Sequence, residues 1–145
     1  MDLKTGKSKF FTENNGNKGV SSNIINCLYE DKNGNLWVGT VMGLCKMNVK
    51  EETFEHFFEK DGLPNDYIYG ILEDEYGSLW LSTNKGLSKY NPSAKENERN
   101  RFRNYLVLDG LQDYEFNQGA FYKSKSGEMF FGGQNGFNAF FPQQI

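Results

Sequence analysis

Residues 30–40 read EDKNGNLWVGT, and residues 73–83 read EDEYGSLWLST. The shared pattern runs on, because GLCKMN at residues 43–48 is matched by GLSKYN at residues 86–91. A repeat of roughly 40–45 residues with short strands and one tryptophan is typical of a β-propeller blade. A single blade cannot bury its apolar face and needs neighbours. The sequence therefore predicts, first of all, a repeat scaffold that serves assembly and recognition. A catalytic role is a much weaker prediction.

A third copy is more divergent than the first two. Residues 125–133 read KSGEMFFGG and take the place of the tryptophan stretch, with Phe130 at the tryptophan position. Gly136 then aligns with Gly43 and Gly86, so the same turn is expected in all three copies. Glycine suits such turns because it accepts the positive φ that they require.

Each copy predicts short strands rich in Ile, Tyr and Phe, separated by glycine turns. No segment has the sustained helical spacing of apolar residues, so the chain is expected to be all-β. The expected architecture is three four-stranded antiparallel propeller blades, which is a partial propeller. First strands are expected at residues 24–30, 67–73 and 116–123, second strands at 36–40, 79–83 and 129–133, third strands after Gly43, Gly86 and Gly136, and fourth strands at 53–58 and 101–106.

The ends of the chain decide how the blades are divided. Residues 7–12 resemble a fourth strand with nothing before it, and the last copy stops after its third strand. An N-terminal outer strand that completes the last blade would leave no open sheet edge there. We expect residues 1–21 to hold an outer strand of a preceding or last blade plus a linker, followed by blades at 22–64, 65–112 and 113–145, the last without its outer strand.

The composition fits one domain and argues against nucleic acid. Hydrophobic residues make up only 37% of the chain, but 16% is aromatic, and each buried ring removes a large area from water. The net charge is −3, and the basic run at residues 99–103 overlaps a polar insertion at 93–101 that predicts a solvated loop rather than a polyanion site. The sequence shows no signal peptide and no membrane-spanning apolar run, which for an excised fragment says little about its parent.

Two cysteines occupy the first repeat. Cys27 is expected in a first strand and Cys45 in a third strand, with a second strand between them. Their backbones would then lie about 9–10 Å apart, which is further than the roughly 7 Å that a disulfide spans. We therefore expect two free, mostly buried thiols.

The repeat resembles a known family. The pattern D-x-x-G-x-L-W-(V/L)-(G/S)-T-x-x-G-L at residues 31–44 and 74–87, with the linker DGLPND at 61–66, is similar to the two-component regulator propeller repeat. Residues 115–120 and 133–138 resemble the terminal blade of that family, which there precedes a small β-sandwich and a membrane-spanning segment. The resemblance covers nearly the whole chain.

This resemblance implies a sensor. Propellers of the family form the extracytoplasmic part of bacterial histidine kinases, often hybrid ones, and known members respond to oligosaccharides. The chain would then be a periplasmic or extracellular part of an inner-membrane sensor, with an oligosaccharide ligand and with the missing β-sandwich and kinase portions as partners. It departs from the family in having three repeats instead of many more, and it lacks the kinase parts, so it cannot itself transfer phosphoryl groups.

Two motifs have structural explanations that compete with functional ones. Asp31, Asn33 and Asn35 space oxygen ligands as a calcium loop does, but the second copy breaks this spacing, so a hairpin turn is favoured and no metal is expected. Trp37 and Trp80 could stack on sugars. Their recurrence with the repeat favours a core between blades instead.

The residues predict neither a catalytic site nor a cofactor. His56 is the only histidine and lies among phenylalanines on an expected outer strand, which favours a structural or surface role. Glu73 with Asp74, and Glu51 with Glu52, are adjacent in sequence, and adjacent strand residues face opposite sides of a sheet. A glycosidase-type propeller enzyme is therefore the least favoured alternative.

Propeller geometry predicts where a ligand would bind. Loops that join fourth to first strands, and second to third strands, share one face and ring the central channel. Aromatic rings there can stack on apolar sugar faces, and amides can bond sugar hydroxyls. The candidate ligand-binding residues are Asn65, Asp66, Tyr67, Asn84, Lys85, Asp113, Tyr114, Asn117, Gln134 and Asn135. Ordinary turn chemistry is the alternative for each of them.

We therefore interpret the chain as a ligand-sensing or signal-relay propeller unit, and a structural or protein-interaction unit is the alternative. Three blades fall short of the usual four to eight and leave apolar end faces. We expect a two-fold dimer that closes a six-bladed ring, in which residues 7–12 of one copy complete the last blade of the other. Neither nucleic-acid binding nor direct membrane insertion is expected.

Overall fold

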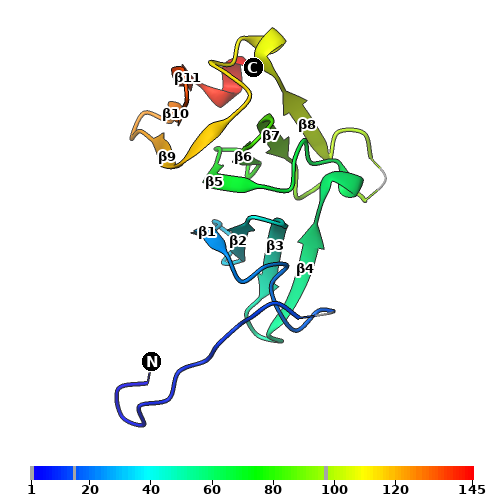
Figure 1. Cartoon of the computed structure of the whole chain (residues 1–145), viewed down its shortest axis with the longest axis vertical. Helices are drawn as coiled ribbons and strands as arrows, with labels where there is room; N and C mark the ends of the chain where they lie inside the picture. Colours follow the sequence, from blue (N-terminus) through cyan, green and yellow to red (C-terminus); the bar gives the residue numbers. More distant parts are fainter. Residues whose placement is uncertain (1, 15, 97) are drawn as a thin grey trace.

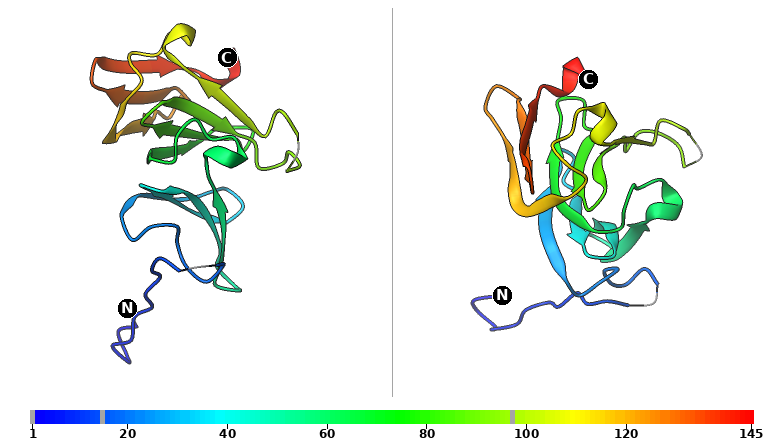
Figure 2. Two further views of the ribbon diagram at one scale, coloured as in Figure 1. Left: turned by 45° about the vertical axis from the view of Figure 1, so that its right-hand side comes forward. Right: turned by 45° about the horizontal axis from the view of Figure 1, so that its top comes forward.

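The computed structural model describes residues 2–14, 16–96 and 98–145, and it contains three antiparallel sheets that stack as successive blades (Figures 1 and 2). Blade 1 comprises β1 (Ile25–Glu30), β2 (Leu36–Thr40), β3 (Gly43–Asn48) and β4 (Thr53–Phe57). Blade 2 comprises β5 (Ile68–Glu73), β6 (Leu79–Thr83), β7 (Gly86–Tyr90) and β8 (Phe102–Tyr105). Blade 3 comprises β9 (Phe116–Lys123), β10 (Met129–Gly133) and β11 (Gly136–Phe140). Short 3₁₀ turns lie at η1 (Glu59–Asp61), η2 (Val107–Asp109) and η3 (Pro142–Gln144).

The all-β propeller class is confirmed, and the strands lie where the repeat predicts them. All three second strands and the first strand of blade 3 agree to the residue, while the other first and fourth strands are shorter by one or two residues at their ends. Blades 1 and 2 each have four strands in sequential order, whereas blade 3 has three among the residues that the structure describes. The expectation of three four-stranded blades is therefore met by the first two, and the outer edge of β11 has no strand beside it in the described part of the chain.

The expected outer strand at residues 7–12 does not form in the single chain. Its residues are exposed, with Phe10 at 86% exposure, and they carry no strand pairing apart from an isolated bridge of Glu13 to Val20 just beyond them. Phe11 instead rests against the Phe54 ring with centroids 5.6 Å apart. A strand needs a partner edge, and blade 3 with its open β11 edge lies at the opposite end of the molecule from this segment (Figure 1).

The turn between the first two strands of a blade is built around one buried carboxylate. Asp31 Oδ1 accepts hydrogen bonds from the backbone N–H groups of Asn33 (3.0 Å) and Asn35 (2.9 Å), and Oδ2 accepts the indole N–H of Trp37 (2.8 Å). In blade 2, Asp74 accepts the corresponding turn N–H groups and the Trp80 indole at 3.0 Å. The hairpin interpretation of this motif is confirmed, because both carboxylate oxygens of Asp31 accept hydrogen bonds from groups of the turn and of the strand that follows it.

Blade 3 changes this arrangement at three positions together. Ser124 stands at the aspartate position and accepts the Glu128 N–H at 3.0 Å, while Phe130 stands at the tryptophan position and has no N–H to donate. In blades 1 and 2 a lysine opposite the tryptophan lies over its ring, with Lys46 at 5.5 Å from the Trp37 centroid. Ala139 is opposite Phe130 in blade 3. The outer face of blade 3 is therefore more apolar than its counterparts.

The core lies between the blades, and both tryptophans are inside it, as predicted. Trp37 is fully buried with Leu44 and Phe57 of blade 1 against Ile68 and Leu81 of blade 2. Trp80 repeats this arrangement against the β9 and β10 side chains of blade 3. Blades 1 and 2 therefore each offer one apolar face to the next blade. The other face of blade 1 packs against the N-terminal segment, where Val20 is buried with Val38, Cys45, Met47 and Phe54.

Close packing between blades explains a glycine in the middle of a strand. Gly70 of β5 lies against the ring of Phe121, and a Cβ atom added at Gly70 would overlap that ring. Gly39 of β2 is similarly close to Cys27 and Ile68. Neither glycine needs a left-handed backbone, so the requirement is one of space.

The two cysteines are free thiols, as predicted. Cys27 is opposite Gly39 and Cys45 is opposite Val38, so strand β2 separates them. Cys45 is buried and Cys27 is partly buried. Burial raises the pKa of the Cys27 thiol to about 12, so it stays protonated at neutral pH.

Candidate functional site

Connections between blades and turns within blades interlock on one face of the molecule. The N–H of Gly43 donates to the carbonyl of Asp66 (2.6 Å), and the N–H of Gly86 donates to the carbonyl of Tyr114 (2.6 Å). Each bond joins a turn between second and third strands to a connection between blades. We call the surface formed by residues 58–67, 84–85, 106–115 and 134–135 the loop face. All but one of the ten candidate residues lie on it, and Asn117 is just beyond, in β9.

A cluster of aromatic and polar side chains forms on the loop face between blades 2 and 3. The Tyr69 hydroxyl lies 2.9 Å from Asn84 Oδ1 and 3.2 Å from Glu115 Oε1, and it can donate its single proton to either oxygen. The Tyr67 ring lies beside the Tyr69 ring, with centroids 4.7 Å apart and planes tilted by 43°. Four residues from three different segments of the chain thus meet at one place.

The ionisation state of Tyr69 follows from its surroundings. Burial of the ring raises the pKa of Tyr69 to about 12, and the hydrogen bond and negative charge of Glu115 act in the same direction. The hydroxyl is therefore neutral at physiological pH and serves as a hydrogen-bond donor and acceptor. Tyr67, Asn84 and Glu115 remain at least partly accessible to solvent. The cluster combines an accessible ring with an amide and a carboxylate, a combination that suits a ligand rich in hydroxyl groups.

Two of the predicted residues shape the connection between blades 1 and 2. Asn65 accepts the N–H of Tyr67 at 2.9 Å and donates its amide to Glu59 at 3.2 Å. Asp66 Oδ1 accepts the N–H of Glu59 at 2.7 Å. The polar side-chain atoms of both residues therefore bond groups of the loop itself. The bond from Asn65 holds the backbone of Tyr67 in place.

The remaining predicted residues gather around the connection between blades 2 and 3. Asp113 Oδ1 accepts the N–H of Tyr114 at 2.7 Å. Asn135 donates its backbone N–H to Gln112 Oε1 at 2.7 Å and its amide to the Gln112 carbonyl at 3.3 Å. The side chains of Lys85, Tyr114, Asn117 and Gln134 are exposed to solvent.

Tyr69 and Glu115 belong to the cluster although they are absent from the predicted set. Tyr69 was missed because it lies within strand β5 and not in a loop, and Glu115 because it immediately precedes β9. A usable signal was present for Tyr69, since residues two apart on a strand point to the same side and Tyr67 was already a candidate. Glu115 carries no such signal.

The only histidine has a structural contact. His56 Nε2 lies 2.8 Å from the carbonyl oxygen of Gly19, and Asn104 of blade 2 makes the corresponding bond to Gly62 at 2.9 Å. The described residues contain no group of three or more His, Cys, Asp and Glu side chains that could hold a metal ion. The hollow of about 580 Å³ on blade 1, which Lys46 and Glu55 help to line, includes none of the predicted residues.

No helix in the described ranges is both long enough and apolar enough to cross a bilayer.

Comparison with known proteins shows which family of repeats the chain matches. A sequence model of the two component regulator propeller family matches residues 19–42 and 62–85. The chain is similar to the extracellular domain of BT3049 from B. thetaiotaomicron, described as a hybrid two component system, with 34% identity and a TM-score of 0.77 over 85% of this chain. It is also similar to the extracellular domain of BT4673 from the same organism, likewise described as a hybrid two component system, with 25% identity and a TM-score of 0.69 over 87% of this chain.

These likenesses cover a small part of the larger proteins. The chain spans 16% of the BT3049 structure and 18% of the BT4673 structure. Virginiamycin B lyase from Staphylococcus aureus is 14% identical, with a TM-score of 0.54 over 80% of this chain and 40% of the lyase, and shares the fold alone. The comparison with curated proteins found no match.

Proposed function

The chain carries two-component regulator propeller repeats, and from this premise we propose that it forms part of the ligand-sensing surface of a bacterial sensor. Its likeness to extracellular domains of two component systems supports this role. The sensor would display the propeller in the periplasm or outside the cell and would carry a β-sandwich and a kinase in its other parts. The propeller would detect a ligand or relay its presence, and the chemistry of phosphoryl transfer would lie elsewhere.

The proposed ligand is an oligosaccharide that binds on the loop face. The observation that carries this proposal is the Tyr69 hydroxyl held between Asn84 and Glu115, with the Tyr67 ring beside it. Sugars present apolar ring faces and many hydroxyl groups. An accessible tyrosine can pack against the former, and amide and carboxylate oxygens can bond the latter. The inner pairing of Tyr69 fixes Asn84 and Glu115 before a ligand arrives, which lowers the cost of ordering them.

A binding screen with matched variants tests the proposal. The protein is titrated calorimetrically with neutral, acidic and branched oligosaccharides, and one class is expected to bind. Tyr67→Ala should weaken that binding by about tenfold or more, which corresponds to about 1.4 kcal/mol. Tyr76→Ala is the control, because Tyr76 also carries an accessible ring, 74% exposed where Tyr67 is partly buried, but lies in the turn between β5 and β6, at the far end of β5 from Tyr67. Absence of binding across the panel, or equal losses in both variants, would contradict the proposal.

A further inference from the structure

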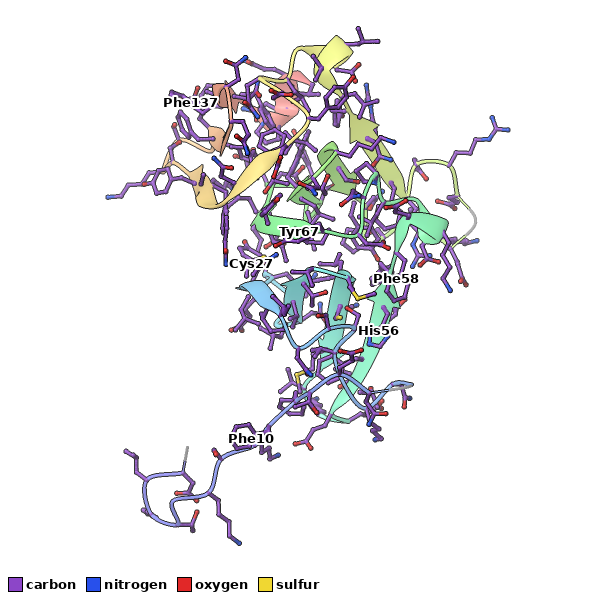
Figure 3. All side chains as sticks on the ribbon, viewed as in Figure 1. Phe10, Cys27, His56, Phe58, Tyr67 and Phe137 are labelled. Atoms are coloured by element: carbon purple, nitrogen blue, oxygen red, sulfur yellow. The ribbon has the colours of Figure 1, made fainter. Side chains whose placement is uncertain are left out.

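A hollow of about 460 Å³ lies on blade 2, beside the connection between β7 and β8. Three cationic residues, Lys89, Arg99 and Arg103, help to line it, and no acidic residue does so among those that the structure describes. The connection projects beside the three blades as a loop of mostly exposed residues (Figures 1 and 3). The net charge of the chain is −3, so a wall with positive charge alone stands out against the rest of the surface.

The two arginines have charges that no other described residue balances. Lys89 Nζ lies 3.4 Å from Asp74 Oδ2, so the charge of Lys89 already has a partner. Neither Arg99 nor Arg103 forms an ion pair within the described ranges of the chain. The guanidinium group of Arg103 lies over the Tyr105 ring, 5.0 Å from its centroid, which orders the group without neutralising it. The hollow on blade 2 therefore has two positive charges available for a ligand.

Blade 1 has a hollow at the same register, and the two hollows differ in charge. Lys46 of blade 1 is opposite Glu55, whereas Lys89 of blade 2 is opposite Arg103. Other residues that line the hollows correspond in the repeat: Asn35 to Ser78, Asn48 to Asn91 and Phe54 to Phe102. The fold of the repeat does not require a cation opposite the lysine, because blade 1 forms with a glutamate there. The cation in blade 2 therefore favours a role in binding.

The groups around the hollow on blade 2 suit a tetrahedral oxyanion. Arginine presents its N–H groups in a planar fork that matches pairs of phosphate oxygens, and sulfate has the same geometry. Ser78, Asn91 and Asn100 add a hydroxyl group and two amides to the wall. An ester of phosphate has three strong acceptor oxygens for these donors, whereas a carboxylate has two. The Phe102 ring also lines the hollow and offers an apolar surface to the organic part of an ester.

We propose that the hollow on blade 2 binds a small organic molecule through a phosphate or sulfate ester group. Its volume lies in the range of small-molecule sites, so there is room for the organic part beside the ester. The hollow is separate from the Tyr69 cluster, because Ser78 precedes β6 and Asn84 of that cluster follows the same strand. The site is thus an addition to the loop face and does not depend on the function proposed for that face.

Backbone amide chemical shifts recorded during a titration test the proposal, because they detect weak binding and also locate it. The probes are glucose 6-phosphate and glucose 6-sulfate, with glucose and glucuronate as the neutral and carboxylate comparisons. At least one ester should bind about tenfold more tightly than glucuronate, with the largest shifts at Ser78, Asn91, Asn100 and Arg103. Absence of ester binding, or equally tight binding of glucuronate or glucose, would overturn the proposal.

A matched pair of variants shows whether the site or the net charge attracts the ester. Arg99→Ala should weaken ester binding by about tenfold, because one charge-assisted contact is lost. Lys125→Ala is the control, since it removes the same charge at an exposed position in the turn between β9 and β10, and ester binding should stay at the wild-type level. Equal losses in the two variants would mean attraction by net charge and would overturn the proposal.

Two further variants locate the site. Arg103→Glu reproduces the charge arrangement of blade 1 and should abolish ester binding. Because Arg103 also packs on Tyr105, circular dichroism must show that this variant is folded, and Arg99→Ala, in an exposed loop, decides the question if it is not. Tyr67→Ala should leave ester binding unchanged. A loss of ester binding in Tyr67→Ala would place the ester on the loop face and would overturn the separate site.

Discussion

Trp37 donates its indole N–H to the carboxylate of Asp31 over 2.8 Å, and in the next blade Trp80 donates to Asp74 over 3.0 Å. The bond ties the largest side chain of each interblade core to the turn that precedes its strand. It fixes where the indole lies, so the position of the ring against the next blade is set from within its own blade. The family pattern of an aspartate six residues before a tryptophan therefore has a direct structural meaning.

The coupling between Asp74 and Trp80 can be measured by a double-mutant cycle. Asp74→Ala removes the acceptor of two turn N–H groups and leaves the buried Trp80 indole unpaired, which should cost about 2–3 kcal/mol in the free energy of unfolding by urea. Asp74→Ser combined with Trp80→Phe reproduces the Ser124 and Phe130 pair of blade 3. The double variant should lose less stability than the sum of its two single variants.

Glu51→Ala provides the control for that cycle, because Glu51 is exposed and its substitution should leave the unfolding free energy nearly unchanged. Strict additivity of Asp74→Ser and Trp80→Phe would show that the two side chains do not act together.

The carboxyl group of Asp31 should make the free energy of unfolding depend on pH in the acidic range. Burial alone would raise the pKa of its carboxyl, but the hydrogen bonds from Trp37, Asn35 and Asn33 outweigh burial and hold that pKa below its ordinary 3.8. A lowered folded-state pKa contributes stability that is present above the unfolded pKa and is lost as pH falls through the folded value. Asp31→Asn should therefore flatten the decline of the unfolding free energy between about pH 5 and about pH 2. An unchanged acid profile in this variant would contradict the assignment.

Gly70 should tolerate no side chain while Phe121 is in place. Gly70→Ala should destabilise the protein by about 1–3 kcal/mol, because the added methyl group overlaps the Phe121 ring across the boundary of blades 2 and 3. In a Phe121→Ala background the same substitution should cost much less, since the ring is gone. Thermal unfolding of the four proteins gives the coupling energy. Equal costs in both backgrounds would mean that this boundary is not packed as described.

The hydroxyl group of Tyr69 should make the free energy of unfolding depend on pH in the alkaline range. Its pKa is raised from 10.0 to about 12, first by burial and then by Glu115. A raised folded-state pKa contributes stability that is fully present below the unfolded pKa and is lost as pH rises through the folded value. The unfolding free energy of the wild type should thus fall more steeply than that of Tyr69→Phe between pH 10 and about pH 12. Parallel profiles would contradict the buried position of this hydroxyl beside Glu115.

Sequence patterns predicted the strands because glycine turns and short apolar runs act locally. The second strand at residues 79–83 is one example, since a turn glycine precedes it and the Gly86 turn follows it. The bond between Asp31 and Trp37 is also local, and it could have been suspected because Ser124 and Phe130 replace both members together in the third copy.

The features that the sequence patterns did not predict depend on contacts between distant parts of the chain. Tyr69 and Glu115 are brought together by the stacking of blade 2 on blade 3, which no local pattern encodes. Residues 7–12 have the composition of a strand, yet a strand also needs a partner edge, and the open edge of β11 lies at the opposite end of the molecule from that segment.

The proposed function requires that the loop face between blades 2 and 3 receives a carbohydrate. An amide chemical-shift map, recorded while the protein is titrated with the oligosaccharide that binds in the calorimetric screen, tests this most directly. If the carbohydrate binds there, the largest shifts should occur at Tyr67, Tyr69, Asn84 and Glu115. Shifts centred instead on the outer face of blade 3, or on the hollow of blade 1 that Lys46 and Glu55 help to line, would contradict it.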